Sequence, residues 1–103
     1  MSGFEDISEA DFMGSVIEEA HLRGWLCAHF RPARTKHGWV TAVSADGAGF
    51  PDICLARDGQ VVFLELKSAT GRVTPEQQRW LDALPNAHLL RPADYHRLAT
   101  ILR

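Results

Sequence analysis

The chain lacks the features that mark several large classes of protein. It contains no apolar run long enough to cross a membrane and no signal peptide with a charged start and an apolar centre. It has no Gly-x-Ser-x-Gly motif and no phosphate-binding P-loop, so the sequence supports neither a hydrolase triad nor an NTPase. No His-x-x-x-His or Cys-x-x-Cys is present, which argues against a zinc site.

Cysteine and positive charge are also scarce. Cys27 and Cys54 both lie in apolar, strand-like segments, so we expect buried thiols rather than a disulfide, and a cytoplasmic location. The formal net charge of −2 does not indicate a nucleic-acid binder as a whole. Residues 29–37 nevertheless form a basic segment without any acid, which is either a solvated loop or a phosphate-binding surface: His29, Arg31, Arg34, Lys36 and His37.

The length of 103 residues, 46% of them hydrophobic, predicts a single domain with one core. We expect a tail over residues 1–8 and a folded domain over residues 9–103. A first helix should start at Ser8, where Ser-x-x-Asp fits a capping box, and stop at Gly24. Helical spacing places Glu9 at the centre of the apolar stripe and Glu18 on the opposite side; the stripe comprises Phe12, Met13, Val16, Ile17 and Ala20.

The rest of the pattern predicts strands and two further helices. We expect a strand over 25–30, a polar loop over 32–38, and a short strand or ordered arm over 39–44. A second long helix should follow Thr74, because Thr, Pro and Gln at 74, 75 and 77 suit a capping box with proline at the first helical position. A last strand over 87–91 and a final helix from Pro92 complete an α/β sandwich with a mixed sheet; the final helix should turn Tyr95, Leu98, Ala99 and Leu102 inward.

The centre of the sequence predicts a β-hairpin. Asp58-Gly59 favours a two-residue type I′ turn, which would pair Arg57 with Gln60. Continuing that register places Asp52 opposite Glu65, with Cβ atoms about 5 Å apart on one face of the sheet. Lys67 follows Glu65 by two residues and therefore points to the same face, while Ile53, Leu55, Val62 and Leu64 fill the other.

Two carboxylates and one amine thus converge at the end of the hairpin. Facing like charges destabilise a strand pair, and a cation between them would remove that cost. Hard oxygen ligands at this spacing suit Mg²⁺ or Mn²⁺, and a divalent ion beside a lysine can activate water and stabilise a phosphoryl group. The alternative is a surface hairpin with scattered charges, but the apolar residues around these charges count against it.

These residues also carry a resemblance to a known family. Asp52, Glu65 and Lys67, with Pro51 before the aspartate, resemble the PD-(D/E)XK nuclease motif. The longer pattern is similar to the virus-type replication-repair nuclease (VRR-NUC) family from about Glu9 to Leu84; it comprises Gly49-Phe50-Pro51-Asp52, Glu65-Leu66-Lys67-Ser68, Gly71, Thr74-Pro75-Glu76-Gln77 and Trp80. Met13 departs from the glutamine that the family often has there.

The resemblance implies a single-domain restriction-endonuclease-like fold with element order α-β-β-β-α-β-α. It also implies a Mg²⁺-dependent endonuclease, with Mn²⁺ able to substitute, that cuts branched DNA such as four-way junctions and acts as a homodimer in a bacterial or phage-infected cell. Asp52 and Glu65 would bind metal, helped by Glu9 and the Leu66 carbonyl. Lys67 would act on the attacking water or the phosphorane.

The remaining roles leave alternatives open. The capping box is a sufficient structural reason for Gln77, and the resemblance adds an active-site role in which Gln77 orients Lys67 or a phosphate. Phosphate contacts would come from Arg31, Arg34, Lys36, His37 and Arg72. Two other functions remain: a non-catalytic DNA-binding or assembly module on a nuclease fold, and a sequence-specific restriction-type enzyme.

Overall fold

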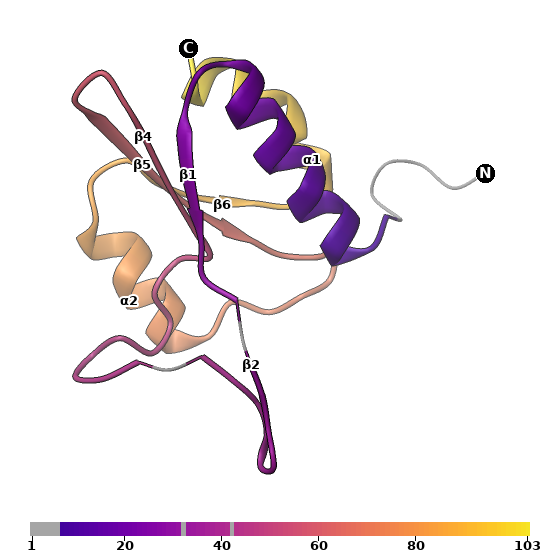
Figure 1. Ribbon diagram of the computed structural model, residues 1–103, viewed down its shortest axis with the longest axis vertical. Coiled ribbons are helices and arrows are strands. Elements are labelled where there is room, and N and C mark those ends of the chain that lie inside the picture. The colour runs from indigo at the N-terminus through magenta and orange to yellow at the C-terminus, as the bar shows by residue number, and fades with distance from the viewer. Residues whose placement is uncertain (1–6, 32, 42) are drawn as a thin grey trace.

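A four-stranded mixed sheet with helices on both faces forms the centre of the protein (Figure 1). The computed structural model describes residues 7–31, 33–41 and 43–103. The elements in chain order are α1 (Glu9–Leu22), β1 (Leu26–His29), β2 (Ala33–Thr35), β3 (Gly38–Val40), β4 (Ile53–Arg57), β5 (Gln60–Leu66), α2 (Pro75–Ala83), β6 (Ala87–Leu90), the 3₁₀ helix η2 (Pro92–Arg97) and α3 (Leu98–Ile101). The predicted fold class is confirmed.

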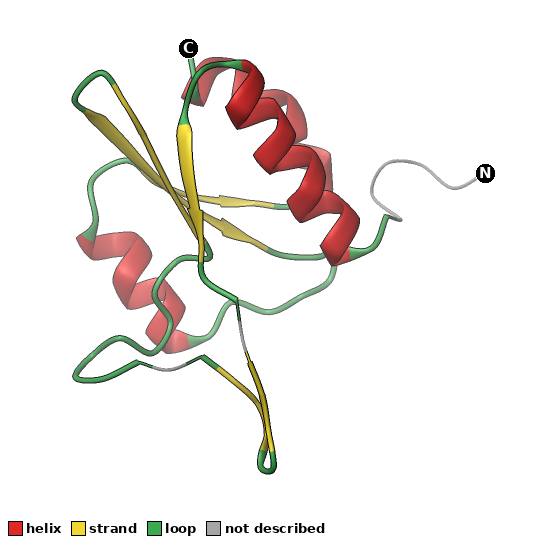
Figure 2. Cartoon of the chain, viewed as in Figure 1, coloured by secondary structure: helices red, strands yellow, loops and turns green. Residues whose placement is uncertain are grey.

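The sheet has the strand order β1-β4-β5-β6. β1, β4 and β5 are antiparallel neighbours. β6 pairs parallel to β5, because the connection through α2 returns the chain so that β6 runs in the same direction as β5. Figure 2 shows α1 and the C-terminal helices on one side of the sheet and α2 on the other. No helix within the described ranges is long and apolar enough to span a membrane.

Alternation along β4 and β5 separates the core from the functional face. Ile53, Leu55 and Leu64 are fully buried and pack with α1 and the C-terminal helices. α1 contributes the apolar side chains of Phe12, Val16 and Ala20; Leu98 begins α3, and Leu102 directly follows it. Residues at the alternate positions of these strands, including Phe63 and Glu65, lie on the other face of the sheet, toward α2. This division confirms the predicted faces of the hairpin.

Local signals set the starts of both long helices and the end of α1, although within the described residues only the Ser8 half of the capping box predicted at 8–11 is formed. The Ser8 hydroxyl accepts from the backbone N–H of Asp11 at 3.1 Å, and Gly24 follows α1 with φ of +81°. Thr74 and Gln77 form a reciprocal capping box at the start of α2. A left-handed residue after the helix suits glycine because it has no Cβ.

Four predictions about the elements need correction. The predicted loop 32–38 contains β2, which pairs with β3 to form a separate hairpin. The segment 39–44, predicted as a short strand or an ordered arm, is a strand only over Gly38–Val40, because pairing with β2 ends there. Ala42, Pro32 and residues 1–6 of the predicted tail lie outside the described residues. The final helix begins as 3₁₀ turns, so its side chains do not follow the spacing of one continuous α-helix, and Ala99 is exposed rather than turned inward. Glu9 is exposed rather than central to the buried stripe, since it is the first residue of α1.

Candidate active site

The β4–β5 hairpin brings the two predicted carboxylates together. Asp58 and Gly59 have φ angles of 49° and 79°, as a type I′ turn requires, and Arg57 pairs with Gln60. The register then continues to Ile53 opposite Leu64, so Asp52 comes opposite Glu65. The carboxylate oxygen Oδ2 of Asp52 accepts from the backbone N–H of Leu66 at 3.0 Å, which fixes its side chain at the end of β5.

Glu65 is the chemically unusual residue of the site. Its side chain lies within the protein, with 2% of the residue exposed. Burial, followed by the negative charge of neighbouring Asp52, raises the pKa of the Glu65 carboxyl from 4.5 to about 8, although Lys67 acts in the opposite direction. One oxygen, Oε1, is buried without a hydrogen-bond partner among the described residues. A buried carboxylate oxygen without a partner is costly, so this arrangement favours a bound cation.

Lys67 completes the convergence predicted from the sequence. Its amine lies 4.0 Å from Oε2 of Glu65, and its side chain is largely buried. Arg91, which the sequence analysis missed, holds the loop after Lys67 by donating to the carbonyls of Ser68 and Gly71, each at 2.7 Å. Parallel pairing of Leu66 with Leu90 places Arg91 beside this loop. No local motif predicts this contact of Arg91, because it depends on the pairing of β5 with β6.

Gln77 joins α2 to the carboxylates. Its Oε1 accepts from the backbone N–H of Thr74 at 2.9 Å, and its Nε2 donates to Oε2 of Glu65 at 3.1 Å. One side chain therefore caps the helix and also contacts Glu65, while the predicted role of orienting Lys67 or a phosphate stays a prediction. The contact is made to Glu65 rather than to Lys67, because the first turn of α2 lies above β5.

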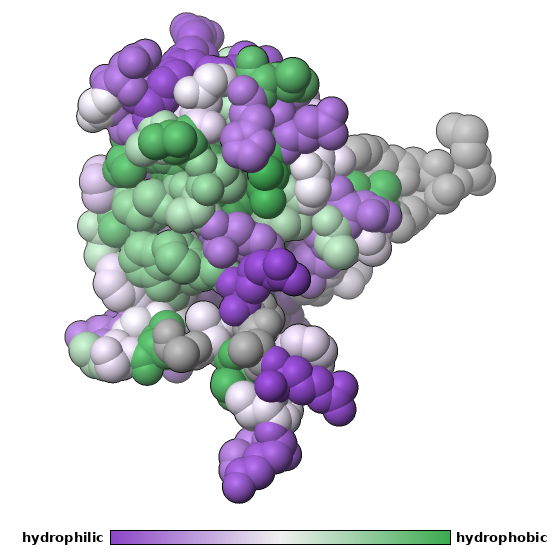
Figure 3. Space-filling model, viewed as in Figure 1, coloured by the Kyte–Doolittle hydropathy of each residue, from purple (hydrophilic) through white to green (hydrophobic). Residues whose placement is uncertain are grey.

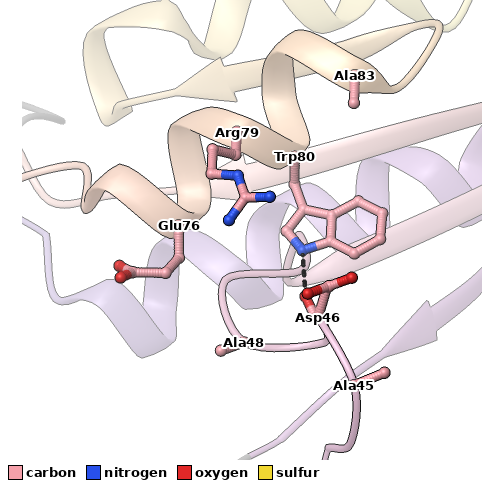
Figure 4. A pocket seen from close by; sticks show the side chains of 7 residues that line it. All are labelled: Ala45, Asp46, Ala48, Glu76, Arg79, Trp80 and Ala83. Carbon is pink, nitrogen blue, oxygen red and sulfur yellow. Dashed lines mark hydrogen bonds between the residues drawn. The ribbon is translucent and has the colours of Figure 1, made fainter.

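The loop before Asp52 packs tightly against α2. Gly49 has φ of +85°, and a Cβ there would come within 2.6 Å of the Glu76 carbonyl carbon. The next residue, Phe50, contacts the ring of Trp80 edge-on, with centroids 5.0 Å apart. The indole N–H of Trp80 donates to the Asp46 carbonyl at 2.9 Å, as Figure 4 shows. Glycine at position 49 thus permits the close approach that positions Asp52.

Figure 4 shows a pocket between this loop and α2. It is lined by three alanines, Asp46 and one side of α2: Ala45, Asp46, Ala48, Glu76, Arg79, Trp80 and Ala83. Asp52, Glu65 and Lys67 are not among its lining residues, so it is separate from the carboxylate site.

The donor set fits a hard divalent cation. Asp52 and Glu65 offer carboxylate oxygens, and the partnerless Oε1 of Glu65 is an available ligand atom. Within the described residues, however, no group of three or more His, Cys, Asp or Glu side chains lies close enough to hold a metal. Exposed Glu9 is therefore not assembled with the two carboxylates here. The Leu66 carbonyl lies at the same end of β5.

The predicted phosphate-binding residues lie on two separate segments. Arg34 is on β2, Lys36 and His37 form the turn to β3, and Arg31 precedes β2; all four are exposed. Figure 1 shows the β2–β3 hairpin projecting from the body of the protein, and Figure 3 shows hydrophilic side chains gathered on it. Arg72 is exposed on the loop between Lys67 and α2.

Comparison with known proteins gives one match. A family model described as the VRR-NUC domain matches residues 19–90, which is more than half of the chain. The matched range contains Asp52, Glu65, Lys67 and Gln77, whereas Glu9 precedes it. No curated protein and no solved structure matches the chain significantly.

Proposed function

Since the chain belongs to the VRR-NUC domain family, we propose that it is a Mg²⁺-dependent, structure-specific DNA endonuclease in which Asp52 and Glu65 bind the metal. Family membership implies a nuclease-type function with DNA as the substrate. The observation that supports the metal site is the buried carboxylate of Glu65, whose Oε1 has no hydrogen-bond partner in the described part of the chain. Mn²⁺ should substitute for Mg²⁺, because both favour oxygen ligands.

The metal would activate water and neutralise charge on the scissile phosphate. The protein's own contribution begins with orientation: Leu66 fixes Asp52 through its N–H, and Gln77 fixes Glu65 through Nε2. The ammonium of Lys67, 4.0 Å from Glu65, is placed to position the attacking water and to stabilise the negative charge of the phosphorane. The Leu66 carbonyl is proposed as a further ligand.

Glu9, exposed at the start of α1, is proposed to help through an intervening water, because within the described residues it forms no group with the two carboxylates that could hold a metal directly. Glu18 is exposed on the same helix and provides a matched control. Glu9→Gln should reduce metal-supported cleavage more than Glu18→Gln, measured over a Mg²⁺ titration. Equal titration curves would remove Glu9 from the site.

The phosphate backbone would be held by exposed cations rather than by net charge. The residues proposed are Arg31, Arg34, Lys36, His37 and Arg72. Contacts to phosphate position DNA without reading its sequence, which suits an enzyme that recognises shape. Branched DNA such as a four-way junction is the proposed substrate, and the cytoplasm the proposed location.

A homodimer is proposed because two active sites related by two-fold symmetry can cut two strands. Leu26 and Ala28 on β1 supply an apolar surface that α2 leaves exposed, and Leu26 is 76% exposed. Figure 3 shows hydrophobic side chains over this part of the sheet. Light scattering after size exclusion should give twice the chain mass, and Leu26→Lys should shift it to a monomer.

The function is tested by incubating the purified protein with Mg²⁺ and linear, nicked, flapped and four-way DNA. Cleavage should favour a branched substrate. Asp52→Ala, Glu65→Ala and Lys67→Ala should each lower the rate at least about a hundred-fold, as loss of a charge-stabilising group does. Circular dichroism should show an intact fold, and Glu18→Ala should cut normally. Wild-type cutting by the Glu65 variant would contradict the proposal.

The second candidate is a non-catalytic DNA-binding module. It would bind the same DNA panel but cut none of it with Mg²⁺ or Mn²⁺. The carboxylate pair, Lys67 and the Gln77 contact favour the enzyme, because a binding module has no need for a buried acid beside a second acid.

A further inference from the structure

A groove runs from the carboxylate site to the base of the β2–β3 hairpin. Its volume is about 620 Å³, and Asp52 and Gln77 lie on its wall. The other walls come from Phe30, the segment after β3 and the loop before Asp52; they include Val40, Thr41, Val43, Gly47, Ala48, Gly49 and Phe50. Whatever occupies the groove is therefore adjacent to a proposed metal ligand.

The walls of this groove are predominantly apolar. Phe30, Val40 and Val43 are 44%, 46% and 52% exposed, although each is a large hydrophobic side chain. Phe50 continues this surface inward, and its ring contacts Phe30 edge-on with centroids 5.7 Å apart. Clustered exposed apolar residues mark a binding site, whereas single ones need no explanation.

Exposed basic residues lie on the hairpin that supplies one of these apolar walls, although Arg34 packs on Trp39, on the opposite face of β2–β3 from Val40. The sequence from His29 to Ala45 contains no acid, and Arg34 and Lys36 are exposed on the hairpin whose Val40 lines the groove. An occupant with negative charges beside flat apolar groups fits this arrangement. A nucleotide has both, because its phosphate is anionic and its base presents an apolar face.

We propose that the groove holds an unpaired base of the DNA strand being cut, next to the scissile phosphate. This inference rests on the proposed function and defines its substrate further. A base within a continuous duplex is paired and stacked, so it reaches such a groove only from a single strand, a branch point or an extruded position. The structure thereby supplies a reason for preferring branched over linear duplex DNA.

A second copy of the chain fits the groove less well. A two-fold interface brings the same surface of both copies together, so the acid-free hairpins would face each other. Like charges would then oppose the association, whereas DNA neutralises them.

The test compares two oligomers of equal charge. Binding of a twelve-nucleotide oligothymidylate and of a twelve-unit abasic oligomer is measured in Ca²⁺, so cleavage is not needed. Wild type should bind the oligothymidylate about ten-fold more tightly, a factor typical of one stacked base. Val40→Trp should fill the groove and reduce this preference to less than about two-fold, while affinity for the abasic oligomer stays the same.

Leu22→Trp provides the matched control, because Leu22 is a large hydrophobic residue, 76% exposed, on α1 across the sheet from the groove. It should retain the base preference, and circular dichroism checks the fold of both variants. Equal wild-type affinity for the two oligomers would overturn the inference, as would an unchanged preference in Val40→Trp. A monomeric Val40→Trp that loses affinity for both oligomers equally would instead assign the groove to a second copy. Failure to cut DNA would count against the proposed function alone.

Discussion

Glu65 combines the physical features that distinguish this site from a surface hairpin. Its carboxyl is buried, faces Asp52, accepts from Gln77 and has one oxygen without a partner in the described part of the chain. Without a metal, burial and the negative charge of Asp52 favour the protonated form, which accounts for the raised pKa of the Glu65 carboxyl. A divalent cation would favour the ionised form instead, so the metal-free and metal-bound proteins should differ in their response to pH.

In EDTA, the melting temperature of wild type should fall as pH rises from about 5.5 to 8. The pKa of Glu65 is about 8 when folded and about 4.5 when unfolded, so between these values the folded state retains a proton that the unfolded state has lost. Stability therefore decreases with pH through this window. Glu65→Gln should remove most of the slope relative to wild type, and Glu18→Gln should not. Parallel curves for wild type and Glu65→Gln would contradict the assigned pKa.

Gln77→Ala should affect both stability and cleavage. It removes a helix-capping contact and the donor to Glu65, so the free energy of unfolding should fall by about 1–2 kcal/mol. Cleavage should fall about ten-fold or more, because the carboxylate loses a charge-assisted hydrogen bond.

The neighbouring Gln78→Ala is the matched control for this change. Gln78 is exposed and donates to Asp82 within α2. Urea unfolding and cleavage rates should both stay near wild type. Equal losses in the two variants would mean that helix stability alone explains the effect.

The contact between α2 and the loop that leads to Asp52 joins two elements around the site. Gly49 lies against the backbone of the first turn of α2, and Phe50 contacts Trp80 on the same helix. This contact places Asp52, which directly precedes β4, and Gln77, from α2, on the wall of one groove. Rigid support of this kind keeps ligand oxygens in position.

Gly49→Ala should be more destabilising than Gly59→Ala. Both glycines have positive φ, but a Cβ at position 59 meets nothing within 4 Å, whereas at position 49 it would approach the Glu76 carbonyl carbon at 2.6 Å. Gly59→Ala should cost about 1–2 kcal/mol for the backbone alone, and Gly49→Ala about 1–3 kcal/mol more. Urea unfolding measures both. Similar losses would show that the loop moves freely away from α2.

At the scale of the whole molecule, positive and negative charges are concentrated in different regions. The net charge is −2, yet the projecting β2–β3 hairpin and the segment before it carry exposed cations. Residues 1–20 hold six acids and no lysine or arginine. DNA affinity should therefore depend on one region of the surface rather than on overall attraction.

Arg31→Ala combined with Arg34→Ala should weaken binding to all DNA sequences alike. Each lost phosphate contact lowers the slope of log K against log salt by about 0.9 for duplex DNA, so the slope should flatten by up to roughly two. Base preference should not change, because phosphates carry no sequence information. Binding is measured in Ca²⁺ over a salt series. Unchanged affinity and slope would place the DNA on the Arg72 loop and the start of α2.

The sequence by itself determined the features that depend on neighbours along the chain. The Asp58-Gly59 turn set the register of β4 and β5, and that register set Asp52 opposite Glu65. Capping residues set the starts of both long helices for the same reason, since each satisfies backbone groups within a few residues of itself. Alternation then assigned the core face and the functional face of the hairpin.

Only the tertiary structure decided the features that depend on residues far apart in the sequence. Helical phase placed Glu9 on the apolar stripe, but Glu9 is the first residue of α1 and is exposed, and the buried residues of that helix begin one turn later at Phe12. The partner of Gln77, the support of the Lys67 loop by Arg91 and the groove between Val40 and Asp52 all arise where separate elements meet. Such contacts follow from how α2 and the strands pack in three dimensions, which no local spacing encodes.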